Sequence, residues 1–316
     1  MSTLPLTAVS FAASLAAPLR VSVVIPAYRA AETIGRALES VLAQTWPVHE
    51  ILVIDDGSPD DLDAALAPYQ GRITLLRQTN QGAAAARNLG LDEATGDLIA
   101  FLDADDQWSP DKLEKCVQTF VKWPETGLVA SRYFLQDETS SRPILLGPSS
   151  ARCLPSHRVA PPEVLDYARE ISTPTVVVRR SALGSQRFDP TLTTAEDRDL
   201  WIRLLLATPV QLLDEPLCRV YHRPDSLSHA NIDADSRCML EVIRRYTPWF
   251  GPLAARRERA YVEYKWAAGH RRRIHAFGHW LRSVWLWPLP FAKKRTRCHL
   301  ARPRTLLSLL RPRRGR

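Results

Sequence analysis

The sequence predicts an α/β fold in which a mostly parallel sheet is flanked by helices. Short apolar runs typical of buried strands alternate with segments whose apolar residues recur at helical spacing. Two of these runs end in carboxylates, at residues 55–56 and 103–106. Ligands of open α/β sheets bind beyond the carboxyl ends of the strands, and clustered carboxylates repel one another unless a cation neutralises them. A divalent metal on a diphosphate would meet this need, so nucleotide binding is the leading expectation.

The alternation is regular over the first 125 residues. The run Val21 to Pro26 is almost continuously apolar and predicts a buried strand. Residues 32–45 follow it with apolar residues at helical spacing and predict a helix. Further strands are expected at 51–54, 73–76 and 98–102, and further helices at 60–69, 83–94 and 110–121.

Beyond residue 125 the alternation becomes irregular. Residues 136–162 are rich in Ser, Pro and Arg and predict a loop or an insertion facing the acceptor. A strand is expected at 175–178. Residues 195–206 begin acidic and become amphipathic, as the start of a helix does.

Charge divides the chain into an acidic body and a basic end. Residues 241–316 hold 20 Lys and Arg against 3 Asp and Glu, a net +17, although the whole chain carries only +8. We therefore expect a flexible leader over residues 1–19, one domain over 20–235, and a basic, Trp-rich extension over 236–316. The 45% hydrophobic and 24% charged residues are those of a folded soluble protein.

Cysteine usage and hydropathy bear on the compartment. The five cysteines are scattered, without a CxxC pair, which favours reduced thiols in the cytoplasm. The N-terminus lacks the basic start of a signal peptide, and no run reaches the 18 apolar residues of a spanning helix.

Five motifs together resemble one enzyme family. They are VSVVIPAY, DDGS, the Ala-Arg-Asn-Leu-Gly run at 86–90, DADD and EDRDLWIR. Their order and approximate spacing are similar to those of family 2 glycosyltransferases with the GT-A fold, over about residues 20–230. Each motif alone is weak, but five in register make coincidence remote. The resemblance implies an inverting, metal-dependent transfer from a nucleotide-sugar donor.

The DADD motif is the candidate metal site. Asp103 and Asp105 lie at i and i+2 of an extended segment, so both can approach one Mg²⁺ or Mn²⁺, ions that prefer oxygen ligands. The resemblance makes Asp105 the direct ligand and places Asp103, with Ala104, near the donor ribose. Asp106 would bind the metal or cap the following helix. The alternative for the whole cluster is a solvated acidic loop.

The first two motifs supply the candidate base pocket. By resemblance, Asp56 accepts from the uracil N3–H, Tyr28 lies against the base, and Pro26 and Ala27 shape the pocket with backbone groups. An Asp-Gly-Ser turn is also ordinary loop chemistry, and Asp55 would then brace it.

The catalytic candidate is Asp197 of the ED motif, which matches the general base of inverting members. A carboxylate at a helix N-terminus stays ionised, as a base for a sugar hydroxyl must. Glu196 is the neighbouring alternative, and helix capping is the structural one. Arg87 matches a family position near the base or the phosphates, with a surface arginine as its alternative. Trp201 and Arg203 are expected to brace the helix.

Two later segments give weaker expectations. Residues 221–228 resemble the family's closing loop, in which His222 or Arg223 would approach the diphosphate. Near the C-terminus Trp280, Trp285 and Trp287 interleave with cations, which favours contact with anionic lipid on the inner membrane face. A nucleic-acid contact and a disordered solubilising tail are the alternatives.

We expect transfer of a sugar, most simply from a UDP-linked donor, to a glycan or lipid-linked acceptor of cell-surface polysaccharide or glycolipid synthesis. Two other functions remain open. A nucleotidyltransferase would also use paired carboxylates, but no Gly-rich basic loop follows the first strand. A catalytically silent nucleotide-sugar binding protein or membrane adaptor would lack the base or the metal ligand. The sequence leaves the sugar and the acceptor undetermined.

Overall fold

The computed structural model describes residues 18–137, 143–148, 152–154, 161–222, 232–269 and 273–288 of the 316-residue chain. The expected leader therefore lies almost wholly outside the described residues. The strands are β1 (Val21–Ala27), β2 (Glu50–Asp55), β3 (Thr74–Arg77), β4 (Leu98–Phe101), β5 (Gln107–Trp108), β6 (Leu128–Asp137), β7 (Ile144–Leu146), β8 (Arg152–Leu154), β9 (Val177–Arg179) and β10 (Val210–His222).

The helices are α1 (Ile34–Leu42), α2 (Leu62–Leu66), α3 (Ala83–Glu93), α4 (Lys112–Lys122), α5 (Pro161–Glu170), α6 (Arg180–Leu183), α7 (Glu196–Ala207), α9 (Ile232–Gly269) and α10 (Arg273–Leu286). Two short 3₁₀ helices, η1 (Ala67–Tyr69) and η2 (Thr173–Thr175), join them. The helix α9 is kinked at Gly251, whose positive φ of 75° interrupts the regular backbone.

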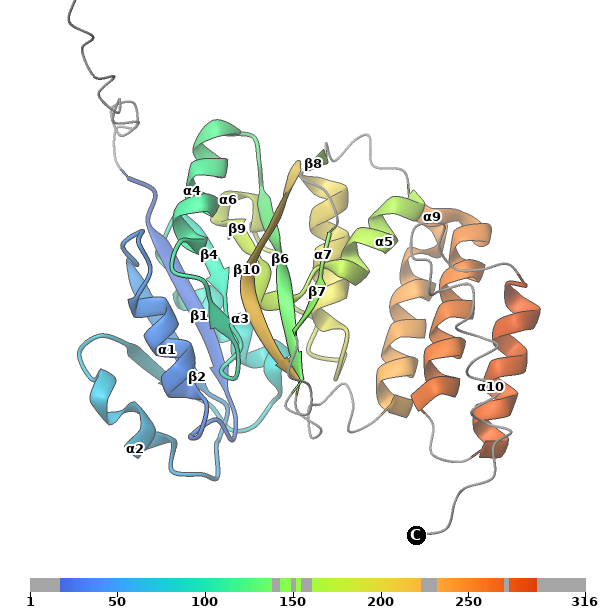
Figure 1. Cartoon of the computed structure of the whole chain (residues 1–316), viewed down its shortest axis with the longest axis horizontal. Helices are drawn as coiled ribbons and strands as arrows, with labels where there is room; N and C mark the ends of the chain where they lie inside the picture. Colours follow the sequence, from blue (N-terminus) through green and yellow to red (C-terminus); the bar gives the residue numbers. More distant parts are fainter. Residues whose placement is uncertain are drawn as a thin grey trace, which may run out of the picture.

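The described strands form one sheet in the order β3-β2-β1-β4-β9-β6-β10-β5 (Figure 1). Its first four strands run parallel, as the alternation predicts. The second half is mixed, because β9 pairs antiparallel with both β4 and β6. Orientation within the second half depends on long-range pairing, which hydrophobic periodicity does not report.

The expectation of a loop over 136–162 is wrong for part of that segment. β6 continues to Asp137, and β7 and β8 pair antiparallel with β6 and β10. Both added strands are three residues long, and Ile144 and Leu145 of β7 are exposed. They are held by hydrogen bonds to a longer neighbour rather than by a buried apolar run, so no strand pattern marks them.

Helices cover both faces of the sheet, and each face has its own apolar core. Residues of α1, α2 and α4 pack on one face with Val23 and Ile25 of β1. Residues of α3, α5, α6 and α7 pack on the other face with Val24 and Phe101. The alternation of Val23, Val24 and Ile25 between the two cores is the period-two pattern of a strand buried on both faces.

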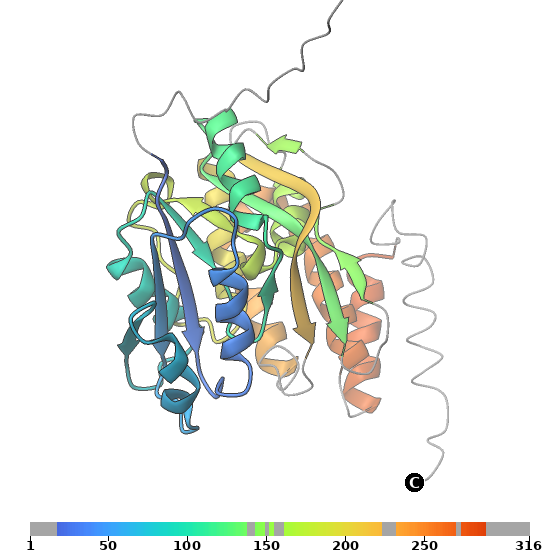
Figure 2. The same ribbon diagram turned by 60° about the vertical axis from the view of Figure 1, so that its left-hand side comes forward.

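The C-terminal helices α9 and α10 lie together at the end of the molecule away from α2 (Figures 1 and 2). Val242, Phe250 and Ala254 of α9 belong to the same core as α5 and α7. The expected boundary between residues 235 and 236 thus falls inside a helix that packs on the sheet-covering layer. None of the helices that the structure describes has the length and apolarity needed to cross a bilayer.

Candidate functional site

The candidate site lies where β1, β2 and β4 end. Ala27 is the register partner of Asp55, and Val24 is that of Phe101, so the three strands finish at one edge of the sheet. This edge brings together Tyr28, Asp56 and the DADD segment, which are far apart in the sequence. The carboxylates that follow β2 and β4 therefore lie at the same edge of the sheet.

Asp56 is buried and holds the turn that starts α3. Its Oδ1 accepts from Gln81 N at 2.8 Å and from Gln78 Nε2 at 2.7 Å, and its Oδ2 accepts from Gly82 N at 2.8 Å. Its own N–H donates to Ala27 O at 2.9 Å. The carboxylate is therefore fixed in direction by the backbone around it.

The segment after β1 is shaped by the DDGS turn. Asp55 Oδ1 accepts from Ser58 N at 2.8 Å, so Asp55 braces the turn. Ser58 Oγ in turn accepts from Arg29 N at 3.2 Å, and Arg29 has a positive φ of 53°. Gly57 is required in this turn, because its φ is +69° and an added Cβ would lie 2.9 Å from Asn80 N.

Tyr28 stands outside this framework, between the buried Ala27 and the strained Arg29. Its side chain is 45% exposed, whereas Ala27 is buried and Pro26 is half-buried. A flat ring presented to solvent at a strand end is available to stack on a nucleobase.

Arg87 joins the two acidic motifs. Its Nη2 donates to Asp103 Oδ1 at 2.8 Å, and its Nη1 donates to Glu196 Oε1 at 2.7 Å. The side chain is buried, so the alternative of a surface arginine is wrong. Burial alone would lower the pKa of Arg87, but the charges of Asp103 and Glu196 raise it above its ordinary value.

The pKa of Glu196 is also raised, which for a carboxyl group disfavours the charged form. Burial and the neighbouring Asp197 raise its pKa above the ordinary value, and Arg87 opposes this only in part. Both carboxylates are half-buried, and they differ in their partners: Glu196 pairs with Arg87, whereas Asp197 accepts from Thr173.

The DADD segment is tied to α1 and to β10. Arg36 donates to the carbonyl oxygen of Asp105, and its guanidinium lies 3.7 Å from the ring centroid of Tyr221. Asp106 Oδ1 accepts from Tyr221 N at 2.9 Å. The helix α4 begins after Asp111, so the expectation that Asp106 caps it is wrong.

The donor set of this segment fits a hard divalent cation. Burial raises the pKa of Asp106 well above its ordinary value, and the charges of Asp103 and Asp105 raise it further, so negative charge is crowded here. Among the described residues no group of three or more His, Cys, Asp or Glu side chains forms a metal site by itself. Two carboxylates completed by diphosphate oxygens are the arrangement to which Mg²⁺ binds in phosphate sites.

Asp197 lies in the first turn of α7. Its Oδ2 accepts from the hydroxyl of buried Thr173 at 2.9 Å. The residue before the helix is Ala195, which has a left-handed φ of 63° and provides no side-chain cap. Asp197 therefore does not act as the N-cap, although its Oδ1 does accept from Arg198 N at 2.6 Å.

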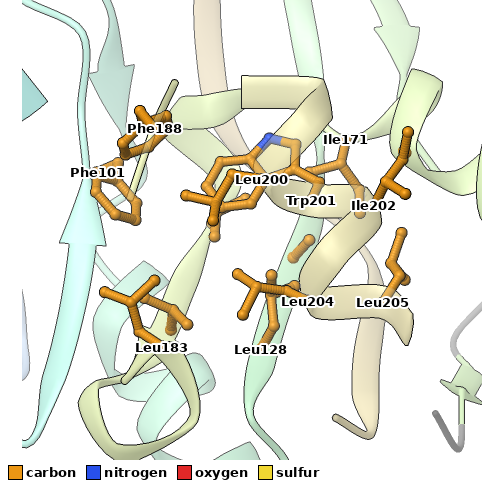
Figure 3. Packing of buried hydrophobic residues seen from close by; sticks show 14 of the residues in the cluster. Phe101, Leu128, Ile171, Leu183, Phe188, Leu200, Trp201, Ile202, Leu204 and Leu205 are labelled. Atoms are coloured by element: carbon orange, nitrogen blue, oxygen red, sulfur yellow. The ribbon is translucent and has the colours of Figure 1, made fainter. Parts of the chain in front are cut away.

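An aromatic cluster fixes α7 relative to β4 (Figure 3). Phe101 of β4 lies 5.5 Å from Phe188 and 5.8 Å from Trp201, measured between ring centroids. Trp201 is fully buried, and Arg203 donates to Asp199 and to the carbonyl of Arg187, so both brace the helix as expected. Phe188 also packs against Arg87, whose guanidinium carbon lies 5.4 Å from the centroid of the Phe188 ring.

The helix α9 contacts α7 at the residues that directly follow Asp197 in the sequence. Buried Arg198 donates from Nη2 to Glu258 Oε2 at 3.1 Å, and Tyr246 Oη donates to Asp199 Oδ1 at 2.9 Å. Arg169 of α5 also donates to Glu258, at 2.9 and 3.1 Å. The C-terminal region thus contributes to the support of the candidate base.

Three contributors were not predicted from the sequence: Thr173, Arg36 and Glu258. The Thr-Pro-Thr run of η2 is the one local signal for Thr173, and nothing local marks the other two. The side chain of His222 and the whole of Arg223 lie outside the described residues, so the expected diphosphate contact is not tested.

Comparison with known proteins points to one family. Residues 22–183 match the model described as Glycosyl transferase family 2. The amylovoran biosynthesis glycosyltransferase AmsB of Erwinia amylovora is 31% identical over 213 residues, which cover 64% of this chain and 69% of that protein. With an uncharacterized glycosyltransferase of Nostoc and one of Rickettsia felis, the chain matches only about a third of the relative's length.

Solved structures share the fold at low identity. S. aureus TarS 1–349 in complex with UDP-GlcNAc superposes with a TM-score of 0.59 at 14% identity, covering 85% of this chain and 89% of that one. The mannosyltransferase PcManGT from Pyrobaculum calidifontis, in complex with GDP-Man and Mn²⁺, gives 0.57 at 18% identity, covering 94% and 82%. Both are consistent with the expected GT-A architecture, here with a mixed sheet and added C-terminal helices.

Proposed function

Because the chain belongs to glycosyl transferase family 2, we propose that it moves a sugar from a nucleotide-diphosphate donor to an acceptor hydroxyl with inversion. The observation behind the proposal is the contact of Arg87 with both Asp103 and Glu196. It joins the strand end that would hold the donor to the helix start that would supply the base.

The donor we propose is a UDP-sugar. Asp56 is held by backbone N–H groups at the strand edge, and Tyr28 is exposed beside it. A carboxylate facing the N3–H of uracil forms a charge-assisted hydrogen bond, whereas guanine would present different edges. The TarS structure binds UDP-GlcNAc and the PcManGT structure binds GDP-Man, so the base has to be determined by experiment.

In the proposed reaction the acceptor hydroxyl loses its proton to Asp197. The acceptor oxygen then bonds to the anomeric carbon while the bond from that carbon to the diphosphate oxygen breaks. Thr173 orients Oδ2 of Asp197 and the Arg198 N–H orients Oδ1, and each carboxylate oxygen keeps a further lone pair that can accept the proton of the hydroxyl. Mg²⁺ or Mn²⁺ held by Asp105 and Asp103 would act as a Lewis acid that neutralises charge on the departing diphosphate.

We propose a glycan or lipid-linked precursor of a cell-surface polysaccharide or glycolipid as the acceptor. The name of the relative AmsB, amylovoran biosynthesis glycosyltransferase, supports this class. The free thiols of Cys116, Cys218 and Cys238 suit a reaction in the reducing cytoplasm.

A screen of UDP-, GDP- and dTDP-sugars for metal-dependent release of the nucleoside diphosphate tests the proposal. We expect release from at least one UDP-sugar, abolished by EDTA and restored by Mg²⁺ or Mn²⁺. Binding of UDP-sugars without any turnover, with or without acceptor extracts, would instead support a silent binding protein.

A further inference from the structure

The helix α10 presents an apolar stripe to solvent. Ile274, Phe277, Leu281 and Trp285 are 88%, 40%, 48% and 74% exposed. Their spacing of three and four residues places them on one side of the helix. Monomeric soluble proteins seldom expose so many large apolar side chains side by side, and such patches mark interaction sites.

The rotation of α10 is fixed by polar contacts on its opposite side. Ser283 Oγ donates to Ala260 O at 2.7 Å, and His279 Nδ1 lies 2.5 Å from Glu263 Oε2. His279 also stacks on Trp266, with ring centroids 3.9 Å apart. These groups are anchored on α9, so α10 cannot turn its stripe inward without losing them.

Positive charge surrounds the stripe. Exposed Arg256 of α9 donates to the carbonyl oxygen of Trp285 at 3.2 Å, and its guanidinium lies 5.6 Å from that indole. The Arg282 side chain is exposed, with its Nε 3.9 Å from Glu263 Oε2, and Arg259 lines the groove between the two helices with Trp285. The sequence of α10 has no acidic residue, and residues 289–316 add ten Lys and Arg without one Asp or Glu.

From this combination we propose that the stripe of Ile274, Phe277, Leu281 and Trp285 docks on an anionic membrane surface. An amphipathic helix with Trp, Phe and Leu on one side and arginines beside them is the composition of interfacial helices. Anionic headgroups attract the arginines, and the apolar side chains enter the headgroup boundary. Protein, nucleic acid and the chain's own C-terminal segment are the competing occupants.

The structure changes which residues would make the contact. The expected contact residues are Trp280, Trp285 and Trp287, but Trp280 and Trp287 are half-buried. Ile274, which is not among the expected residues, is the most exposed large apolar residue of the helix.

Sedimentation of the full-length protein with vesicles tests the surface. Vesicles of phosphatidylcholine with 30% phosphatidylglycerol should bind the protein at low salt, and pure phosphatidylcholine vesicles should bind it at least tenfold more weakly. The double variant Ile274→Glu with Leu281→Glu should lower the partition coefficient at least tenfold. The variant Ile274→Ala with Leu281→Ala should lower it without any change in charge.

The matched control is Trp123→Glu with Ile144→Glu, which adds the same two charges at exposed apolar residues of other elements. It should bind vesicles as the wild type does. Release of UDP from a UDP-sugar should be unchanged in every variant, so a failed surface is distinguishable from a failed function. Thermal melting confirms that each variant is folded.

Deleting residues 289–316 tests whether the stripe or the basic C-terminal segment binds the vesicles. Retained or stronger vesicle binding supports the stripe. The proposal is overturned if that deletion abolishes binding while the glutamate variants keep it. It is also overturned if the wild type ignores anionic vesicles and instead binds RNA, or if it forms a dimer that the glutamate variants dissociate.

Discussion

Asp103 and Glu196 accept hydrogen bonds from the same guanidinium, that of Arg87, at 2.8 and 2.7 Å. Asp103 follows β4 in the parallel half of the sheet, and Glu196 starts α7, which covers one face of the sheet. The aromatic contacts of Phe101 with Phe188 and Trp201 lie beneath this connection. Arg87 therefore connects the strand end where we propose that the donor binds to the helix start that carries the proposed base.

Replacing Arg87 should damage both the fold and the reaction. Arg87→Ala leaves the half-buried carboxylates of Asp103 and Glu196 without their shared cation, so we expect a loss of up to about 3–5 kcal/mol of the free energy of unfolding, which is what breaking a buried ion pair costs. Arg87→Lys keeps the charge but loses the forked geometry, so we expect a smaller loss of stability and a large loss of kcat. Urea unfolding and steady-state kinetics measure the two effects.

Arg187→Ala is the matched control for Arg87. Arg187 pairs with Asp92 on the surface, where a salt bridge contributes about 0–1 kcal/mol. Equal losses of stability in Arg87→Ala and Arg187→Ala would mean that the buried connection does not support the site.

Asp105→Ala should abolish turnover and leave the protein folded. Asp105 is half-buried at the strand end, and its proposed role is to bind Mg²⁺ or Mn²⁺ rather than to support packing. Product release by the wild type in increasing EDTA, and Mn²⁺ affinity of wild type and variant by calorimetry, measure this. Full wild-type activity in excess EDTA would refute metal dependence.

Asp197→Asn should keep donor binding and lose transfer. The amide preserves the shape and can accept from Thr173 but cannot take a proton, and a general base contributes about 10²- to 10⁴-fold to the rate. We expect kcat to fall by that factor, with UDP affinity by calorimetry unchanged. Loss of donor affinity with kcat preserved would contradict the assignment of the base.

UDP should bind more tightly than GDP. The reason is the orientation of Asp56, whose two oxygens are fixed by Gln78, Gln81 and Gly82. A ligand comparison is preferable to a substitution here, because any change at Asp56 would also release the turn before α3. Calorimetry with UDP, dTDP and GDP decides, and tighter binding of GDP would exclude uracil as the base recognised.

The sequence predicts the parts of this site that are local to one strand end or one helix start. The apolar runs before Asp56 and Asp103 predict the strands that carry them, and the acidic start of EDRDLWIR predicts α7. The partners of these residues come from distant segments. Thr173 reaches Asp197 from a 3₁₀ turn; the Thr-Pro-Thr run favours that turn, but it does not predict the contact with Asp197.

In the C-terminal region the net charge does not predict which residues are buried. Its excess of arginine predicts a solvated or membrane-facing extension, and α9 does have such charges. One of the three acidic residues in 241–316, Glu258, is nevertheless buried against Arg169 and Arg198. Net charge averages over residues with different burial, so it cannot distinguish a docked helix from a tail.

Glu258→Gln should therefore destabilise the whole domain in a pH-dependent way. Burial alone would raise the pKa of Glu258, but the charges of Arg169, Arg198 and Arg257 outweigh it and hold the pKa below the ordinary 4.5.

This lowered pKa sets the pH dependence of the stability. A carboxyl group whose pKa is lower in the folded than in the unfolded state stabilises the fold above its unfolded pKa, and this contribution is lost as the pH falls through the folded value. At pH 7 the variant leaves the buried Arg198 without its anion, and we expect it to lose about 3–5 kcal/mol of the free energy of unfolding. The difference from the wild type should shrink as the pH falls from about 4.5, where Glu258 of the unfolded chain becomes protonated, through the lower pKa of Glu258 in the folded protein. Urea unfolding between pH 3.5 and 7 measures it, with Glu163→Gln on the exposed side of α5 as the control. A difference from the wild type that stays constant over this range, or a control that loses as much, would show that the buried charge cluster does not hold α9 to α7.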